Sequence, residues 1–199
     1  LEEVFGKLSY KERSFVNTGI RHRQLADGSV VMDQDAYIAA LKPIVRPEMA
    51  GAAGSSEVTD DLAELYRSLL GAVAYALITQ YWVMVYVVSL QRRSRQPLYV
   101  HVRRLNAVVR IIQRSPAHLT YHAMVPNDVL EGHSDSGFTK EQESGYGIRG
   151  LNLLRHGSSR TSGNVATNTN EKIVHLLDSQ CRSHKHVTRC SFSSETRAA

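Results

Sequence analysis

The sequence predicts an α+β protein in which a β-hairpin and a group of helices precede a mixed sheet with one packing helix. Three observations support this prediction. Strand-like stretches surround an Asp-Gly dipeptide in the first 41 residues, apolar residues recur at helical spacing between residues 60 and 118, and extended patterns return after Pro126. At 199 residues, the chain is long enough for one large domain or two small ones.

Residues 1 to 41 are predicted to form strands. The stretches SFVNTGIRHRQ and SVVMDQDAYIAAL lie on either side of Asp27-Gly28, which favours a hairpin turn. The following stretch, KPIVRPEMAGAAGSSEV, contains two prolines and several small residues, which is typical of a linker.

The middle of the chain contains a long apolar run. Asp60 or Asp61 is expected to cap a helix that begins near Leu62, and residues 69 to 90 then carry no charge, with arginines following from residue 92. This length and this flank fit a membrane span. The alternative is two buried helices broken near Gln80, and the pattern alone leaves both open.

The next helix is predicted from Pro97, a residue suited to a first helical position, to the break at Pro116. Its apolar residues are Leu98, Val102, Leu105, Val109 and Ile112. Arg103, Arg110 and Arg114 fall on a different face, which is either a solvated surface or a phosphate-binding stripe. The net charge of +5 also favours an anionic partner, with nucleic acid as the first candidate.

Three strands and a short helix are predicted after Pro126, with Asp135 on the first strand and Glu195 on the helix. If that helix packs across the strand, the two carboxylates would share a divalent cation, for which Mg²⁺ is suited by its preference for oxygen ligands. By spacing alone, two ordinary solvent-facing acids are the more common explanation.

A second group of metal-ligand types lies near the end of the chain. Cys181, His184, His186 and Cys190 match no common zinc-finger spacing, and the basic residues between them argue against a bound cation. Two cysteines are too few for a disulfide framework, and no signal peptide is visible at the first residue, so a reducing compartment, cytoplasmic or nuclear, is expected.

Several of these stretches resemble Copia-type retrotransposon polyproteins. GHSDSGF resembles the first strand of their RNase H domain, in which a Gly-Tyr-Ser-Asp-Ala pattern supplies the first catalytic Asp, and HVTRCSFSSE resembles the segment that ends in the catalytic Glu. YRSLLGAVAYALITQ and HVRRLNAVVRIIQRSPAHLTY resemble the connection helices. FVNTGIRHRQLADGSVVMDQDAYIAAL resembles the end of the reverse transcriptase, including a Gln-x-x-Tyr helix start.

The resemblance implies four segments: strands of the reverse transcriptase (1–45), a linker (46–59), a helical connection (60–118) and a truncated, RNase H-like domain (119–199). The parent activity would be Mg²⁺-dependent hydrolysis of RNA in RNA–DNA hybrids. Asp135 and Glu195 would be the catalytic residues and metal ligands, and Arg103, Arg110 and Arg114 would bind the hybrid. The polymerase aspartates and the third RNase H carboxylate would lie outside this chain, so the fragment alone is expected to be inactive.

The expected partners are an RNA–DNA hybrid or another nucleic acid, together with the rest of the polyprotein; a membrane is not expected. Two other functions remain as alternatives. One is a non-catalytic, basic nucleic-acid-binding module that uses the arginine-rich helix alone. The other is a single-span membrane protein that uses residues 69 to 90.

Overall fold

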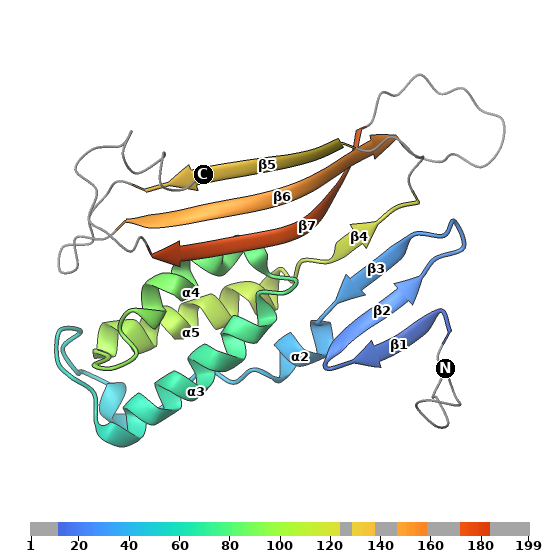
Figure 1. The fold of residues 1–199 in the computed structure, drawn as a ribbon. Coiled ribbons are helices and arrows are strands. Elements are labelled where there is room, and N and C mark those ends of the chain that lie inside the picture. Colours follow the sequence, from blue (N-terminus) through green and yellow to red (C-terminus); the bar gives the residue numbers. More distant parts are fainter. Residues whose placement is uncertain (1–11, 124–128, 138–146, 159–171, 184–199) are drawn as a thin grey trace, which may run out of the picture.

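The computed structural model describes residues 12–123, 129–137, 147–158 and 172–183. The predicted α+β class is confirmed, because the chain forms two antiparallel sheets and a group of helices. Figure 1 shows the helices packed together on one side of the molecule, with β7 of the second sheet running past α4. The first sheet lies next to α2, at one end of the group of helices.

The first sheet contains the predicted Asp-Gly hairpin. Gly28 has a φ of +84°, a left-handed conformation that glycine adopts without strain. The backbone N–H of Ser29 donates a hydrogen bond of 2.9 Å to Oδ1 of Asp27, which closes the turn. The strands follow the order β1-β2-β3-β4, and their bounds are β1 (Ser14–Asn17), β2 (Ile20–Gln24), β3 (Val30–Asp33) and β4 (Leu119–Tyr121).

Two predictions in this region are wrong. Residues 14 to 24 form two strands rather than one, because Thr18 and Gly19 take positive φ values of 47° and 82° and turn the chain back on itself. The strand expected from the residue pattern does not continue after Gln34: helix α2 (Asp35–Ala40) begins there, where the Gln-x-x-Tyr resemblance implies a helix start. Its three alanines favour helix, Asp35 stabilises the first turn, and Ile38 supplies the buried contact.

The helices begin and end close to their predicted positions. Thr59 occupies the position before α3, so this helix begins at Asp60, two residues earlier than expected, and both acids lie in its first turn. Pro97 lies two residues before α5 instead of starting it, while the predicted end before Pro116 is confirmed. The bounds are η1 (Pro47–Met49), α3 (Asp60–Ala76), η2 (Tyr81–Val83), α4 (Met84–Gln91) and α5 (Tyr99–Arg114).

The apolar run from residue 69 to residue 90 is two helices, α3 and α4, joined by a buried polar break. Thr79 and Gln80 are inaccessible to solvent, and Oε1 of Gln34 accepts hydrogen bonds from the Thr79 backbone N–H (3.3 Å) and hydroxyl (2.9 Å). In the described part of the chain, no helix combines the length and the apolar character that crossing a membrane requires. Of the two alternatives, the pair of helices is therefore confirmed.

The main core lies between α3, α4 and α5. The predicted apolar positions within α5 are buried in this core, and the arginines of α5 face outward, while two polar residues, His101 and Asn106, are buried. The Tyr66 hydroxyl donates a 2.8 Å hydrogen bond to the Leu90 carbonyl, which ties α3 to α4. The fully buried core side chains include Leu62, Tyr66, Val73, Val87, Val102, Leu105, Val109 and Ile112.

Replacing Tyr66 by phenylalanine is expected to lower the free energy of unfolding by about 1 to 2 kcal/mol, because the buried Leu90 carbonyl loses its side-chain donor. Urea unfolding, followed by the fluorescence of the single tryptophan, measures this change. The matched control is Tyr86→Phe, since the Tyr86 side chain is exposed. Equal losses in the two variants would contradict the assigned role of the Tyr66 hydroxyl.

The three strands predicted after Pro126 are confirmed, but in the described ranges they pair only antiparallel, in the order β5-β6-β7, and do not form the expected mixed sheet. A β-bulge interrupts the β6–β7 register between Leu153 and Leu154. The predicted helix that carries Glu195 lies outside the described residues. The predicted domain boundaries stay predictions. Strand β4 falls in the predicted last segment (119–199), yet it pairs with β3 of the first sheet. The strand bounds are β5 (Val129–Ser136), β6 (Ile148–Ser158) and β7 (Lys172–Ser183).

Candidate functional site

Asp135 lies on β5, opposite Gly150 of β6, as the sequence pattern predicted. It is therefore a strand residue and not a loop acid. Its side chain is exposed, and Oδ1 accepts a 2.7 Å hydrogen bond from the backbone N–H of Ser136. Glu195, its expected partner, falls outside the described residues, so the predicted pairing of these two carboxylates stays a prediction.

The described carboxylates near Asp135 do not form a site for a pair of Mg²⁺ ions, which requires several carboxylates around the metals. Glu131 faces the same side of β5 but lies four residues away, about 13 Å along an extended strand. Asp178 of β7 is opposite Leu153 in the register and points to the other face of the sheet. In the part of the chain that the structure describes, no group of three metal-ligand side chains includes Asp135.

The three arginines predicted to bind nucleic acid lie on one exposed face of α5. Arg103 and Arg110 are separated by seven residues, about two helical turns, and Arg114 follows one turn later. Nη2 of Arg103 donates hydrogen bonds to the Met49 carbonyl (3.1 Å) and the Ala52 carbonyl (2.6 Å). Arg103 thus also fixes the predicted linker against α5.

A small recess opens beside this face, where residues 44 to 50 pass over α5. It has a volume of about 260 Å³, and the guanidinium-bearing residues that line it are Arg46, Arg103 and Arg110, without an acidic residue. At its edge, the buried Asn106 amide bonds Ile44 in both directions: Oδ1 accepts from the Ile44 N–H (2.8 Å), and Nδ2 donates to the Ile44 carbonyl (2.7 Å). Three guanidinium groups around such a recess suit a phosphate group.

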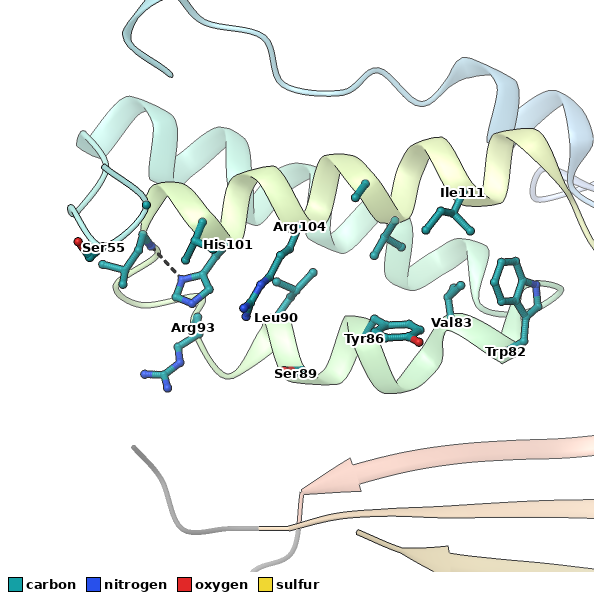
Figure 2. A pocket seen from close by; sticks show the side chains of 15 residues that line it. Ser55, Trp82, Val83, Tyr86, Ser89, Leu90, Arg93, His101, Arg104 and Ile111 are labelled. Atoms are coloured by element: carbon teal, nitrogen blue, oxygen red, sulfur yellow. Dashed lines mark hydrogen bonds between the residues drawn. The ribbon is translucent and has the colours of Figure 1, made fainter. Parts of the chain in front are cut away.

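A larger groove of about 1000 Å³ runs between α4 and α5. Figure 2 shows Trp82 and Tyr86 on one side of it and Arg104 reaching in from α5. The two aromatic side chains are 40% and 59% exposed, respectively. Next to the groove, Nδ1 of His101 accepts a 3.0 Å hydrogen bond from the Leu98 N–H, which caps the start of α5. Aromatic faces beside guanidinium groups suit stacked bases and their phosphates.

Sequence reasoning missed the residues that complete these two surfaces. Arg46 was assigned to a linker, and Trp82 and Tyr86 were assigned to an apolar run. Asn106 carried a usable signal, because an asparagine inside the apolar spacing of a helix requires a buried hydrogen-bond partner.

Of the four cysteines and histidines near the end of the chain that were considered as zinc ligands, the structure describes Cys181. Cys181 lies half-buried on β7, where burial raises the pKa of its thiol and Arg92 partly opposes that shift. His184, His186 and Cys190 lie outside the described residues, so the grouping stays untested.

Comparisons of the chain with protein-family models, with curated proteins and with solved structures find no match.

Proposed function

We propose that this chain is a segment of a Copia-type retrotransposon polyprotein that binds an RNA–DNA hybrid along α5. The order of the elements supports the proposal: a β-hairpin and a helix, a set of connecting helices, and then antiparallel strands that start with the one carrying Asp135. This is the order that the resembling motifs imply for the end of the reverse transcriptase, the connection and the start of an RNase H-like domain. The proposal implies a cytoplasmic or nuclear location.

The observation that carries the binding function is the recess lined by Arg46, Arg103 and Arg110. Guanidinium groups bind phosphate oxygens in a bidentate manner, which positions a nucleic acid without reading its sequence. Arg114 continues the same face by one turn, so successive phosphates of a hybrid would follow the helix axis. The groove with Trp82 and Tyr86 adds surfaces on which unpaired bases would stack.

We expect the 199-residue chain alone to cleave little or no hybrid RNA. Asp135 is a single carboxylate on an exposed strand, whereas Mg²⁺-dependent phosphoryl transfer requires several converging ligands. Under the proposal, Glu195 and groups from the rest of the polyprotein supply the missing ligands.

The double replacement Arg110→Ala with Arg114→Ala is expected to weaken hybrid binding at least about 10-fold at low salt. It should also reduce the slope of log K against log salt by about two, because each arginine neutralises about one phosphate. Fluorescence anisotropy with a labelled RNA–DNA hybrid measures both quantities. The matched control is Arg67→Ala, which removes an exposed arginine from α3. A salt slope as steep as that of the control would contradict a role for this face of α5.

A non-catalytic nucleic-acid-binding module is the second candidate, because Asp135 is exposed and belongs to no three-ligand group within the described ranges. The two candidates differ in the effect of Asp135→Asn on the longer polyprotein. If Asp135 belongs to a nuclease site, the substitution abolishes Mg²⁺-dependent cleavage of hybrid RNA and leaves binding intact. If cleavage is absent or persists unchanged, the binding module is the better explanation.

A further inference from the structure

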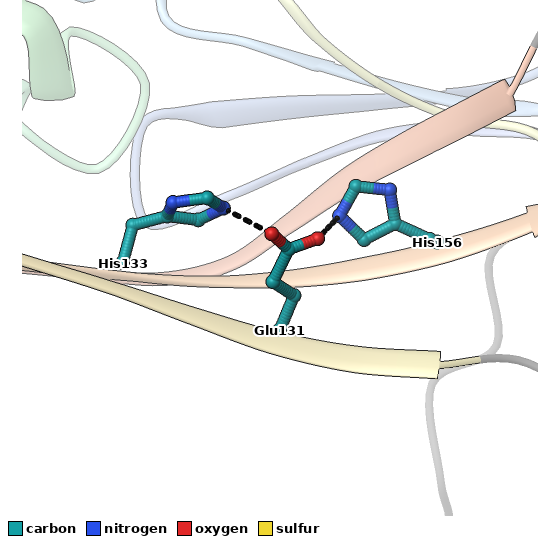
Figure 3. Close-up of side chains that lie close together, drawn as sticks. All are labelled: Glu131, His133 and His156. Atoms are coloured by element: carbon teal, nitrogen blue, oxygen red, sulfur yellow. Dashed lines mark ion pairs between the residues drawn. The ribbon is translucent and has the colours of Figure 1, made fainter.

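Three metal-ligand side chains converge on one face of the second sheet, away from the arginines of α5. Glu131 and His133 alternate on β5 and therefore point to the same side. His156 of β6 lies opposite Val129 in the register, which places it diagonally next to Glu131 on that face. Figure 3 shows both imidazole rings directed at the Glu131 carboxylate between them.

The distances within this Glu-His-His cluster are short. Nε2 of His133 lies 2.9 Å from Oε1 of Glu131, and Nε2 of His156 lies 2.6 Å from Oε2. One ligand atom from each residue can be chosen so that all three lie within 4.8 Å of one another. Nε2 of His156 is shielded from solvent and has no aligned hydrogen bond, despite its proximity to the carboxylate. The Glu131 carboxylate is therefore the charged partner of this nitrogen, and a metal ion bound between the two groups would replace a poorly aligned ion pair.

We propose that Glu131, His133 and His156 bind a divalent transition-metal ion, with Zn²⁺ as the first choice. Zinc is held by imidazole nitrogen and carboxylate oxygen at about 2.0 to 2.2 Å, which separates neighbouring ligand atoms by about 3.4 Å in a tetrahedron. Both imidazole–carboxylate distances are shorter than this value, so side-chain rotations that move the ligand atoms slightly apart would open a coordination sphere. Mg²⁺ is unsuited to this site because it prefers oxygen ligands in an octahedron.

The site would be open to solvent. Side-chain exposures of 46% for Glu131, 55% for His133 and 22% for His156 leave the outer side of the ion accessible. Three protein ligands leave a fourth position of a zinc ion for water or a small anionic ligand. Because the ligands come from two hydrogen-bonded strands, the ion would also tie β5 to β6. The proposal is independent of hybrid binding, since none of these residues lines either surface near α5.

Titration of the purified, metal-free chain with Zn²⁺ alone, by calorimetry, tests the proposal. We expect a single ion per chain and a higher melting temperature when zinc is present. His133→Gln and His156→Gln should each weaken binding more than about 10-fold, since even removal of an outer hydrogen-bond partner of a metal ligand costs that much. Glu131→Gln, which preserves side-chain shape, should also weaken binding and serves if either histidine variant fails to fold.

Two controls separate this cluster from other zinc ligands. His118→Gln removes an exposed imidazole whose Nε2 lies 2.9 Å from Oδ1 of Asp35, and it should leave zinc binding unchanged. Cys181→Ser with Cys190→Ser should also retain binding, and the Co²⁺-loaded chain should show visible d–d bands without thiolate charge-transfer absorption. Absence of zinc binding, binding unaffected by His133→Gln and His156→Gln, or loss of binding only in the cysteine variant would overturn the proposal.

Discussion

Replacing Gln80 by leucine is expected to lower the free energy of unfolding by about 3 kcal/mol or more, since each buried polar group left without a partner costs about 1 to 3 kcal/mol. The Gln80 side chain is inaccessible to solvent and connects the α3–α4 break to the segment after α5. Its Nε2 donates to the Ala117 carbonyl (3.0 Å) and to Oγ1 of Thr79 (2.9 Å). Its Oε1 accepts from the Ala117 N–H (2.9 Å) and from Nε1 of Trp82 (3.3 Å).

Urea unfolding of Gln80→Leu against the parent chain measures this loss. Gln91→Leu is the matched control, because Gln91 is exposed at the end of α4 and the same substitution there should change the free energy of unfolding by less than about 0.5 kcal/mol. Equal stability of the two variants would contradict the assigned role of the Gln80 hydrogen bonds in stabilising the break between α3 and α4.

Asn106→Ala is expected to cost about 3 kcal/mol in stability and also to weaken hybrid binding. The substitution leaves both the N–H and the carbonyl of Ile44 without their side-chain partner in a buried position. Residues 44 to 50 would then lose a main attachment to α5, and Arg46 would no longer be held beside Arg103 and Arg110. The two effects share one cause, so they should appear together.

Chemical unfolding gives the first effect, and anisotropy at a temperature where the variant is fully folded gives the second. Asn152→Ala is the control: Asn152 is exposed on β6, and its Oδ1 accepts one 2.7 Å hydrogen bond from the Ser179 hydroxyl. It should change both quantities little. Unchanged hybrid affinity in a folded Asn106→Ala variant would show that the recess does not contribute to binding.

The helices and strands were largely predictable because their signals are local. The apolar spacing in α5 and the Asp27-Gly28 turn each arise from a few adjacent residues. The turn at Thr18-Gly19 was missed because threonine, a β-branched residue, rarely takes a positive φ. The flanking residues also extend the strand pattern on both sides. The residue pattern alone assigned helix α2 to a strand, because six residues are too few to establish a helical period, whereas the resemblance implied a helix start there.

The candidate site was less predictable because it depends on contacts between distant residues. The position of Asp135 on a strand followed from its neighbours, whereas the pairing of Ile44 with Asn106 spans 62 residues and leaves no periodic signal. The sequence analysis did not single out Glu131 and His133, although they alternate on one strand, because the third member, His156, joins them only through the β5–β6 register. The buried break that separates the two helices depends on hydrogen bonds that Thr79 donates to Gln34, 45 residues earlier in the chain.

Under the proposed function, this chain binds an RNA–DNA hybrid through phosphate contacts and does not cleave the hybrid by itself. The most direct test is to titrate a labelled hybrid with the purified chain at several salt concentrations in the presence of Mg²⁺, and then to resolve the RNA on a denaturing gel. We predict binding that weakens steeply and linearly on a log–log scale with salt, with the RNA left intact. Absence of binding at low salt, or extensive cleavage by the chain alone, would contradict this claim.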